Sequence, residues 1–186
     1  TNAEYTFKTT EEFATLGKHG PAHVQLLLEP LGRNTAPAIA VAALAALREN
    51  PGAILAVMPS DHVVKDDARF VEGIRRAAKV ASTGRLVLFG IKPSEPHTGY
   101  GYIRQGAPLE GFNGGAYSVE AFYEKPDLAT AEQYLAKGGY FWNSGIFVLS
   151  ARTYLEEVAR LEPKILEAAR GALARATDDL GFLRLD

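Results

Sequence analysis

One acidic residue follows an apolar run and is the first candidate for chemistry. Asp61 belongs to the segment 58–62, which comes directly after the apolar stretch 53–58. Ligands of open α/β sheets bind beyond the carboxyl ends of the strands, and a carboxylate there suits Mg²⁺, which prefers carboxylate, water and phosphate oxygens. Phosphoryl and nucleotidyl transfers need such an ion to offset charge on the transferring phosphate. The structural alternative is that Asp61 only caps a turn.

A second candidate segment joins a strand to a helix. Glu29 ends the apolar stretch 23–29, and Asn34 and Thr35 open the alanine-rich segment 35–49. A helix N-terminus offers free N–H groups and the positive end of the helix dipole. The Glu29 carboxylate is able to accept both donors on the N1–N2 edge of guanine, an edge that adenine lacks. The alternative is that Asn34 and Thr35 are only N-caps and that Glu29 is a surface residue.

Three further segments carry groups of the kind that bind sugars and phosphates. Gly99 lies in the segment 97–103, where glycines allow a ligand to approach the backbone closely. Glu124 and Lys125 combine a carboxylate for hydroxyl groups with an ammonium group for a phosphate. Asn143 follows the only tryptophan and can donate and accept hydrogen bonds at once. Taken singly, each has a structural alternative: a tight turn, a solvated ion pair, or a turn asparagine beside a core tryptophan.

The elements that must position these residues alternate between strand-like and helix-like segments. We expect strands at 23–29, 53–58, 86–90, 117–123 and 146–149, and helices at 9–17, 35–49, 66–82, 127–137, 150–161 and beyond Pro163. The prolines and glycines of 93–106 predict an irregular stretch, and the tail is expected to fray toward Asp186. The β-α-β-α-β order with short links predicts a parallel α/β sheet.

Composition narrows the class of protein. The chain has 186 residues, of which 47% are hydrophobic and 23% charged, and this is enough to build one globular domain over residues 1–186. A net charge of −2 gives no general attraction to nucleic acid or to acidic membranes. The absence of cysteine excludes disulfides, thiol nucleophiles and cysteine-based zinc sites. With no signal peptide and no long apolar run, we expect a cytoplasmic protein.

The candidate segments occur in an order that resembles one family. The motifs are Glu29-Pro with Arg33-Asn-Thr-Ala-Pro37, Pro59-Ser-Asp-His62, Thr98-Gly-Tyr-Gly-Tyr-Ile103, Glu124-Lys-Pro126 and Tyr140-Phe-Trp-Asn-Ser-Gly145. In this order they resemble the mannose-1-phosphate guanylyltransferases, or GDP-mannose pyrophosphorylases, of the sugar-phosphate nucleotidyltransferase family. The resemblance implies a Rossmann-like nucleotidyltransferase fold, with a mixed, mostly parallel sheet flanked by helices. It also implies that GTP and mannose 1-phosphate react to give GDP-mannose and pyrophosphate, with Mg²⁺ as cofactor.

The resemblance also assigns roles to single residues. Asp61 resembles the family's magnesium-binding aspartate, and Lys125 resembles the catalytic lysine that faces the sugar phosphate. Glu124 and Asn143 resemble the residues that bind the mannose hydroxyls, and Gly99 lies where the backbone contacts the sugar.

The nucleotide half of the implied site falls on the earlier segment. Glu29, Asn34 and Thr35 resemble the nucleotide-binding loop that faces guanine. The implied mechanism is in-line attack of a mannose 1-phosphate oxygen on the α-phosphorus of GTP, so positioning and charge neutralisation carry the catalysis.

Two departures from the family pattern bear on activity. Family members begin with a strand and a glycine-rich loop that cradles the triphosphate, and nothing before Glu29 has that pattern. The family's second magnesium-binding aspartate and its frequent isomerase domain also have no counterpart here. We therefore expect a chain truncated at its N-terminus, with little or no turnover. A missing core strand would leave apolar surface exposed, which favours association with another chain, such as a homodimer.

Two alternative functions stay open. One is a sister nucleotidyltransferase that uses another base or sugar, such as UTP with glucose 1-phosphate. The other is a non-catalytic module that binds nucleotide sugars, which the missing glycine-rich loop would favour. A nucleic-acid binder is poorly supported because no basic stripe alternates with aromatic residues. The four histidines show no metal-ligand spacing.

Overall fold

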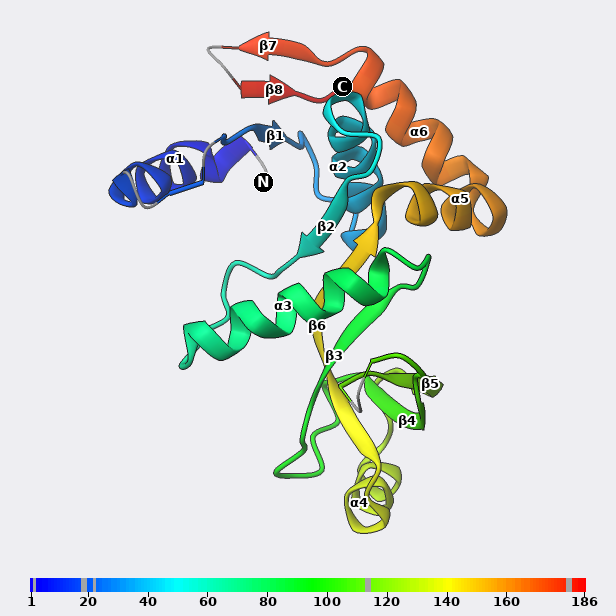
Figure 1. Cartoon of the computed structure of the whole chain (residues 1–186). Coiled ribbons are helices and arrows are strands. Elements are labelled where there is room, and N and C mark those ends of the chain that lie inside the picture. The colour runs from blue at the N-terminus through cyan, green and yellow to red at the C-terminus, as the bar shows by residue number, and fades with distance from the viewer. Residues whose placement is uncertain (2, 18–19, 22, 113–114, 180–181) are drawn as a thin grey trace. The chain divides into compact units, whose positions relative to one another are not determined.

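The computed structural model describes residues 1, 3–17, 20–21, 23–112, 115–179 and 182–186 as alternating helices and strands (Figure 1). Contacts divide the chain into two compact units. The first unit comprises Thr1–Ala53 and Ala151–Asp186, and the second unit is Ile54–Ser150. The single domain that we expect over residues 1–186 stays a prediction.

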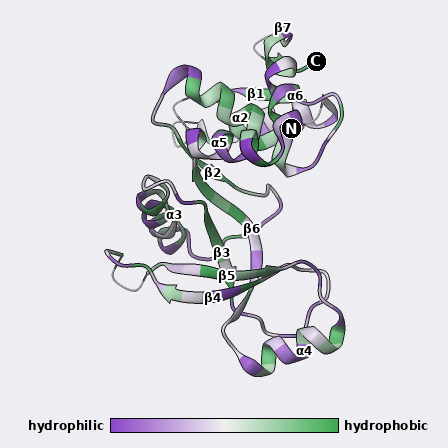
Figure 2. Ribbon diagram, turned by 90° about the vertical axis from the view of Figure 1, so that its right-hand side faces the viewer, coloured by the Kyte–Doolittle hydropathy of each residue, from purple (hydrophilic) through white to green (hydrophobic). Residues whose placement is uncertain are grey.

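The second unit is built on a five-stranded sheet. Its strands are β2 (Ile54–Val57), β3 (Val87–Ile91), β4 (Tyr102–Pro108), β5 (Tyr117–Tyr123) and β6 (Tyr140–Ser150). The long strand β6 pairs with β2, β3 and β4, and β5 pairs with β4 at the edge. Figure 2 shows that β2, β3 and the later part of β6 are hydrophobic, as is expected of strands that share a core.

The expected α/β class, with a mixed sheet flanked by helices, is confirmed, but the expected direct pairing of parallel strands is wrong. In the part of the chain that the structure describes, only β1 and β8 pair in parallel, and every other ladder is antiparallel. Strands β2 and β3 do run in the same direction, because each is antiparallel to β6. However, β6 lies between β2 and β3 and runs antiparallel to both. The order of elements along the chain does not predict this insertion.

Helices cover the sheet of the second unit. Helix α3 (Asp67–Ala81) packs Ala77 and Ala81 against Val148 of β6. Helix α4 (Leu128–Lys137) buries Ala131 among the tyrosines of β4 and β6. The side chains of Asp66 and Asp127 accept hydrogen bonds from the first-turn N–H groups of α3 and α4, as the sequence predicts for N-caps.

The first unit combines a helical core with a small sheet. Its elements are η1 (Ala3–Tyr5), α1 (Thr6–Thr15), β1 (Leu26–Leu28), α2 (Thr35–Glu49), α5 (Ala151–Leu161), α6 (Pro163–Ala174), β7 (Thr177–Asp179) and β8 (Phe182–Arg184). Apolar residues of α2, α5 and α6, including Ala40, Leu155 and Ala169, are buried. The expected fraying of the tail is wrong, because β8 pairs with β1 and β7 pairs with β8.

Two expected loops are strands in the second unit. The stretch 93–106, predicted to be irregular, contains the start of β4, in which Tyr102 and Ile103 are buried. Strand β6 begins at Tyr140, not at residue 146, so Trp142 and Asn143 lie in a strand and not in a turn. Pairing with β3 and β4 on its two sides holds this part of β6 extended in spite of Gly145.

Candidate active site

The predicted sugar-binding residues converge on the middle of β6. Asn143 pairs with Gly90 of β3, and its backbone N–H donates a hydrogen bond to the carbonyl of Gly101 at 2.7 Å. Its side-chain Oδ1 accepts a hydrogen bond from the N–H of Gly145 at 3.3 Å. The oxygen is thus engaged locally, which leaves the amide Nδ2 as the donor that Asn143 can offer to a ligand.

Glu124 reaches the same place from the end of β5. A Cβ at Gly101 would lie 3.0 Å from Oε2 of Glu124 and 2.8 Å from Cζ of Phe122. Only a glycine leaves the room that these two side chains occupy. The structure therefore brings the Glu124 carboxylate, the buried Gly101 and Asn143 together, although they are far apart in the sequence.

Lys125 extends this group, and its backbone is unusual. Its Nζ lies 3.4 Å from Oε1 of Glu124, with the two side chains 64% and 61% exposed. An ion pair as exposed as this contributes little to stability. Lys125 also has φ 45°, a left-handed conformation that costs an L-residue about 1–2 kcal/mol. This strain, immediately before Pro126, marks a position where backbone geometry is held for something other than local stability.

A short aromatic group borders the loop that carries Gly99. The rings of His97 and Tyr100 stack with their centroids 3.9 Å apart, and Tyr100 meets Trp142 edge-on at 5.3 Å. The Nε1 atom of Trp142 is buried and has no hydrogen-bond partner among the described residues. Trp142 directly precedes Asn143 on β6, so one strand carries a member of the aromatic group and one of the predicted sugar-binding residues.

The loop of Asp61 meets the same part of β6. A Cβ at Gly145 would lie 3.5 Å from Cγ of Pro59, which places the segment after β2 beside Gly145. Asp61 lies in an exposed turn of this segment. No group of three or more carboxylate, histidine or cysteine side chains that could hold a metal occurs among the described residues. The role of Asp61 as a Mg²⁺ ligand stays a prediction; a single carboxylate is the kind of site that substrate phosphates and waters complete.

The predicted nucleotide-binding residues all belong to the first unit. Glu29 is half-buried at the end of β1, and its N–H donates to the carbonyl of Thr1 at 2.9 Å. Asn34 is the N-cap residue of α2, but its φ of 67° leaves its side chain without a capping hydrogen bond. Thr35 is the exposed first residue of the helix. The hydroxyl of Tyr154 on α5 donates to the carbonyl of Ala36 at 2.9 Å and so ties this helix end to α5.

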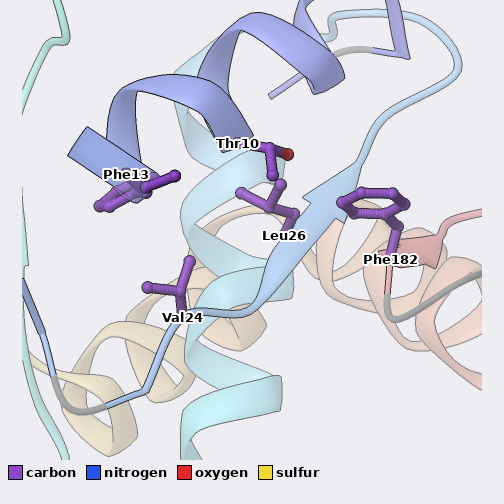
Figure 3. Close-up of a pocket in the computed structure, with 6 residues that line it drawn as sticks. Thr10, Phe13, Val24, Leu26 and Phe182 are labelled. Atoms are coloured by element: carbon purple, nitrogen blue, oxygen red, sulfur yellow. The ribbon is translucent and has the colours of Figure 1, made fainter. Parts of the chain in front are cut away.

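The first unit also has an apolar hollow (Figure 3). Phe13 and Ala14 of α1, Leu26 of β1 and Phe182 of β8 line it together with Thr10 and Val24. None of these described lining residues is ionisable.

Three features of the site were not predicted from the sequence. The first is the hydrogen bond between Gly99 and His97, for which the two-residue spacing from histidine to glycine was the available signal. The others are the proximity of Gly101 to Glu124 and that of Gly145 to Pro59. The first depends on the pairing of β4 with β5 and the second on that of β2 with β6, and both pairings bring together residues that are distant in the sequence.

Comparison with known proteins identifies the family. The chain matches the nucleotidyl transferase family over residues 1–186. The chain belongs to the nucleotidyl transferase family. This membership agrees with the order of motifs and with the α/β architecture described above.

Individual relatives of this nucleotidyl transferase chain are longer. It is 50% identical to the xanthan biosynthesis protein XanB of Xanthomonas campestris pv. campestris strain B100, over 100% of this chain and 38% of that protein. It is 44% identical to the mannose-1-phosphate guanylyltransferase of Escherichia coli strain K12, over 100% of this chain and 39% of that protein. The chain thus spans less than two fifths of the length of these relatives.

Two solved structures resemble this chain. One is described as mannose-6-phosphate isomerase from Helicobacter pylori, with a TM-score of 0.85 and 33% identity, over 100% of this chain and 69% of that one. The other is described as mannose-1-phosphate geranyltransferase from Thermus thermophilus, with a TM-score of 0.74 and 39% identity, over 90% of this chain and 48% of that one. Among the described residues, no helix is both long and apolar enough to cross a membrane.

Proposed function

We propose that this chain is part of an enzyme that transfers GMP from GTP to mannose 1-phosphate, which gives GDP-mannose and pyrophosphate. The observation that carries the proposal is that Glu124, which follows β5, and Asn143 of β6 both lie against Gly101, which directly precedes β4. The relatives named mannose-1-phosphate guanylyltransferase, at 42–44% identity over nearly the whole chain, support this choice of sugar and base.

In the proposed reaction, an oxygen of mannose 1-phosphate attacks the α-phosphorus of GTP in line. The bond between the α-phosphorus and the bridging oxygen breaks, and pyrophosphate leaves. The sugar side of this step is assigned to the second unit, where the Glu124 carboxylate accepts hydrogen bonds from sugar hydroxyls and the Asn143 amide donates one. Lys125 offers its ammonium group to the sugar phosphate. No covalent intermediate is required, so these residues act by holding the attacking oxygen in place.

Charge on the phosphates must be offset by cations. In this proposal Asp61 holds Mg²⁺ as its single carboxylate ligand, and the bound ion supplies positive charge beside the transferring phosphate. On the nucleotide side, the half-buried Glu29 accepts the two donors of guanine, while Asn34 and Thr35 offer polar groups at the N-terminus of α2.

The proposal is tested by calorimetric titration of the chain with GDP-mannose and, separately, with UDP-glucose, both with Mg²⁺. We expect binding of GDP-mannose at least tenfold tighter than that of UDP-glucose. Glu124→Gln should weaken GDP-mannose binding at least tenfold, because its side chain can no longer accept two charge-assisted hydrogen bonds. Glu132→Gln, which changes an exposed glutamate on α4, is the matched control and should bind as the unaltered chain does.

Each outcome separates the alternatives. Tighter binding of UDP-glucose would favour a sister nucleotidyltransferase, and equal effects of Glu124→Gln and Glu132→Gln would remove Glu124 from the site. Release of pyrophosphate from GTP and mannose 1-phosphate would contradict a module that only binds nucleotide sugars.

A further inference from the structure

A histidine outside the predicted site residues holds the backbone of Gly99. The N–H of Gly99 donates a hydrogen bond to Nδ1 of His97 at 3.0 Å. A ring nitrogen that accepts a hydrogen bond carries no proton, so this contact uses Nδ1 of His97 as an acceptor. We propose that His97 is a positioning residue, which keeps the Gly99 backbone oriented for the sugar. This inference rests on the proposed function.

Close packing between the two residues supports the same role. A Cβ at Gly99 would lie 2.9 Å from Cε1 and 3.2 Å from Nδ1 of His97. The backbone of Gly99 therefore lies directly against the edge of the imidazole ring. Any side chain at position 99 would push the ring away and break the hydrogen bond.

His97 is in turn fixed to the core of the second unit. Its carbonyl accepts a hydrogen bond from the hydroxyl of Tyr102 at 2.9 Å, and Tyr102 is fully buried on β4. Its ring stacks on Tyr100 with an interplanar angle of 10° and meets Trp142 of β6 edge-on at 6.3 Å. These contacts leave the imidazole little freedom, so its Nδ1 is a preorganised acceptor.

The other end of the loop is tied to the sugar-side residues. The carbonyl of Gly101 accepts a hydrogen bond from the backbone N–H of Asn143 at 2.7 Å. The loop 97–101 is thus held at its start by a histidine and at its end by the strand that carries Asn143.

Two substitutions of His97 test its hydrogen-bond acceptor and its aromatic ring separately. In His97→Asn the side-chain oxygen can still accept the N–H two residues further on, as in an Asx-turn. In His97→Phe the ring can still stack on Tyr100, but the acceptor is lost. GDP-mannose affinity of all three chains is measured by calorimetry under the same conditions.

The inference predicts a specific pattern of affinities. His97→Asn should bind within about threefold of the unaltered chain, whereas His97→Phe should bind about tenfold more weakly, which is the loss of one hydrogen bond. Equal binding by His97→Phe and the unaltered chain, or equal losses in His97→Asn and His97→Phe, would overturn the inference.

A second measurement keeps the inference independent of the proposed function. No binding of GDP-mannose by the unaltered chain would contradict the proposed function alone, and NMR of the labelled chain then decides on His97. The amide proton of Gly99 should exchange slowly with solvent in the unaltered chain and in His97→Asn, and about tenfold faster in His97→Phe. Equal exchange rates in the three chains would show that the hydrogen bond does not hold the loop.

Discussion

At the scale of single residues, Lys125 combines a strained backbone with an exposed charge. Lys125→Gly and Lys125→Gln both remove the ammonium group, and only glycine relieves the positive φ of 45°. We expect both variants to bind mannose 1-phosphate at least tenfold more weakly, with Lys125→Gly more stable than Lys125→Gln by about 1 kcal/mol. Denaturant unfolding and calorimetry measure the two effects separately. Equal stability of the variants would show that the backbone at this position is not strained.

Asn143 allows its two hydrogen-bonding groups to be tested separately. Asn143→Asp keeps the oxygen that accepts the N–H of Gly145 and replaces the Nδ2 donor with a second acceptor. We expect nearly unchanged thermal stability and at least a tenfold loss of GDP-mannose affinity, because a sugar hydroxyl loses its donor. Asn50→Asp is the matched control, since Asn50 makes the same contact with the N–H of Gly52 in the first unit. If both variants bind equally well, Asn143 does not contact the sugar.

Glu29 tests the proposed choice of base. Glu29→Gln replaces one of the two carboxylate acceptors with a donor, so one guanine N–H loses its partner. We expect the preference for GTP over ATP, measured as the ratio of their dissociation constants, to fall by about tenfold or more. The role of Glu29 in base recognition is contradicted if that ratio stays the same.

At the scale of elements, the N-cap of α4 links stability to pH. The side-chain and backbone hydrogen bonds from Thr130 lower the pKa of Asp127 below its ordinary value of 3.8. Because the folded-state pKa is the lower one, the charged cap stabilises the fold above pH 3.8, and this stabilisation is lost as the pH falls through the folded-state pKa. The melting temperature of the unaltered chain should exceed that of Asp127→Asn at pH 7. The difference should disappear in strongly acidic solution, and a constant difference would contradict the effect.

The packing of β3 against β6 depends on a glycine. A Cβ at Gly90 would lie 2.8 Å from Cβ of Phe141. Gly90→Ala should therefore destabilise the fold by about 1–3 kcal/mol, as overpacking does. In Gly52→Ala, the added Cβ would lie no closer than 3.5 Å to the nearest atom, and the free energy of unfolding should change by less than about 0.5 kcal/mol. Equal unfolding free energies for the two variants would contradict the close packing at β3.

The sequence predicted elements better than it predicted their pairing. Helices α2, α3 and α4 and their capping residues follow from local patterns, because side-chain caps and alanine-rich stretches act within a few residues. Strand β4 and the first half of β6 were missed, since glycine and proline weaken a strand pattern while pairing with distant strands stabilises it. The pairing of β1 with β8 was missed for the same reason, because it joins segments more than a hundred residues apart.

The candidate site shows the same limit. The order of motifs was enough to name Glu124 and Asn143, but their meeting at Gly101 depends on the register of β4 and β6. The acceptor role of His97 depends on a loop geometry that no residue pattern specifies. The candidate site residues could thus be named from the sequence, whereas the contacts that orient their side chains could not be predicted from it.

At the scale of the whole molecule, the proposed residues divide between the two units. Glu29, Asn34 and Thr35 lie in the first unit, and Asp61, Gly99, Glu124, Lys125 and Asn143 lie in the second. The proposed sugar side can therefore be tested within a single compact unit. The chain spans less than two fifths of the length of its relatives, so its own turnover is a separate question from ligand binding.

The most direct test of the central claim is an NMR titration of the ¹⁵N-labelled chain with mannose 1-phosphate and Mg²⁺, with glucose 1-phosphate as the comparison. The account predicts that mannose 1-phosphate shifts the amide signals of Gly99, Gly101, Lys125 and Asn143 most strongly, and that glucose 1-phosphate shifts them less. If these four signals stay in place while others move, such as those of the apolar hollow around Phe13, the sugar phosphate binds elsewhere and the account is contradicted.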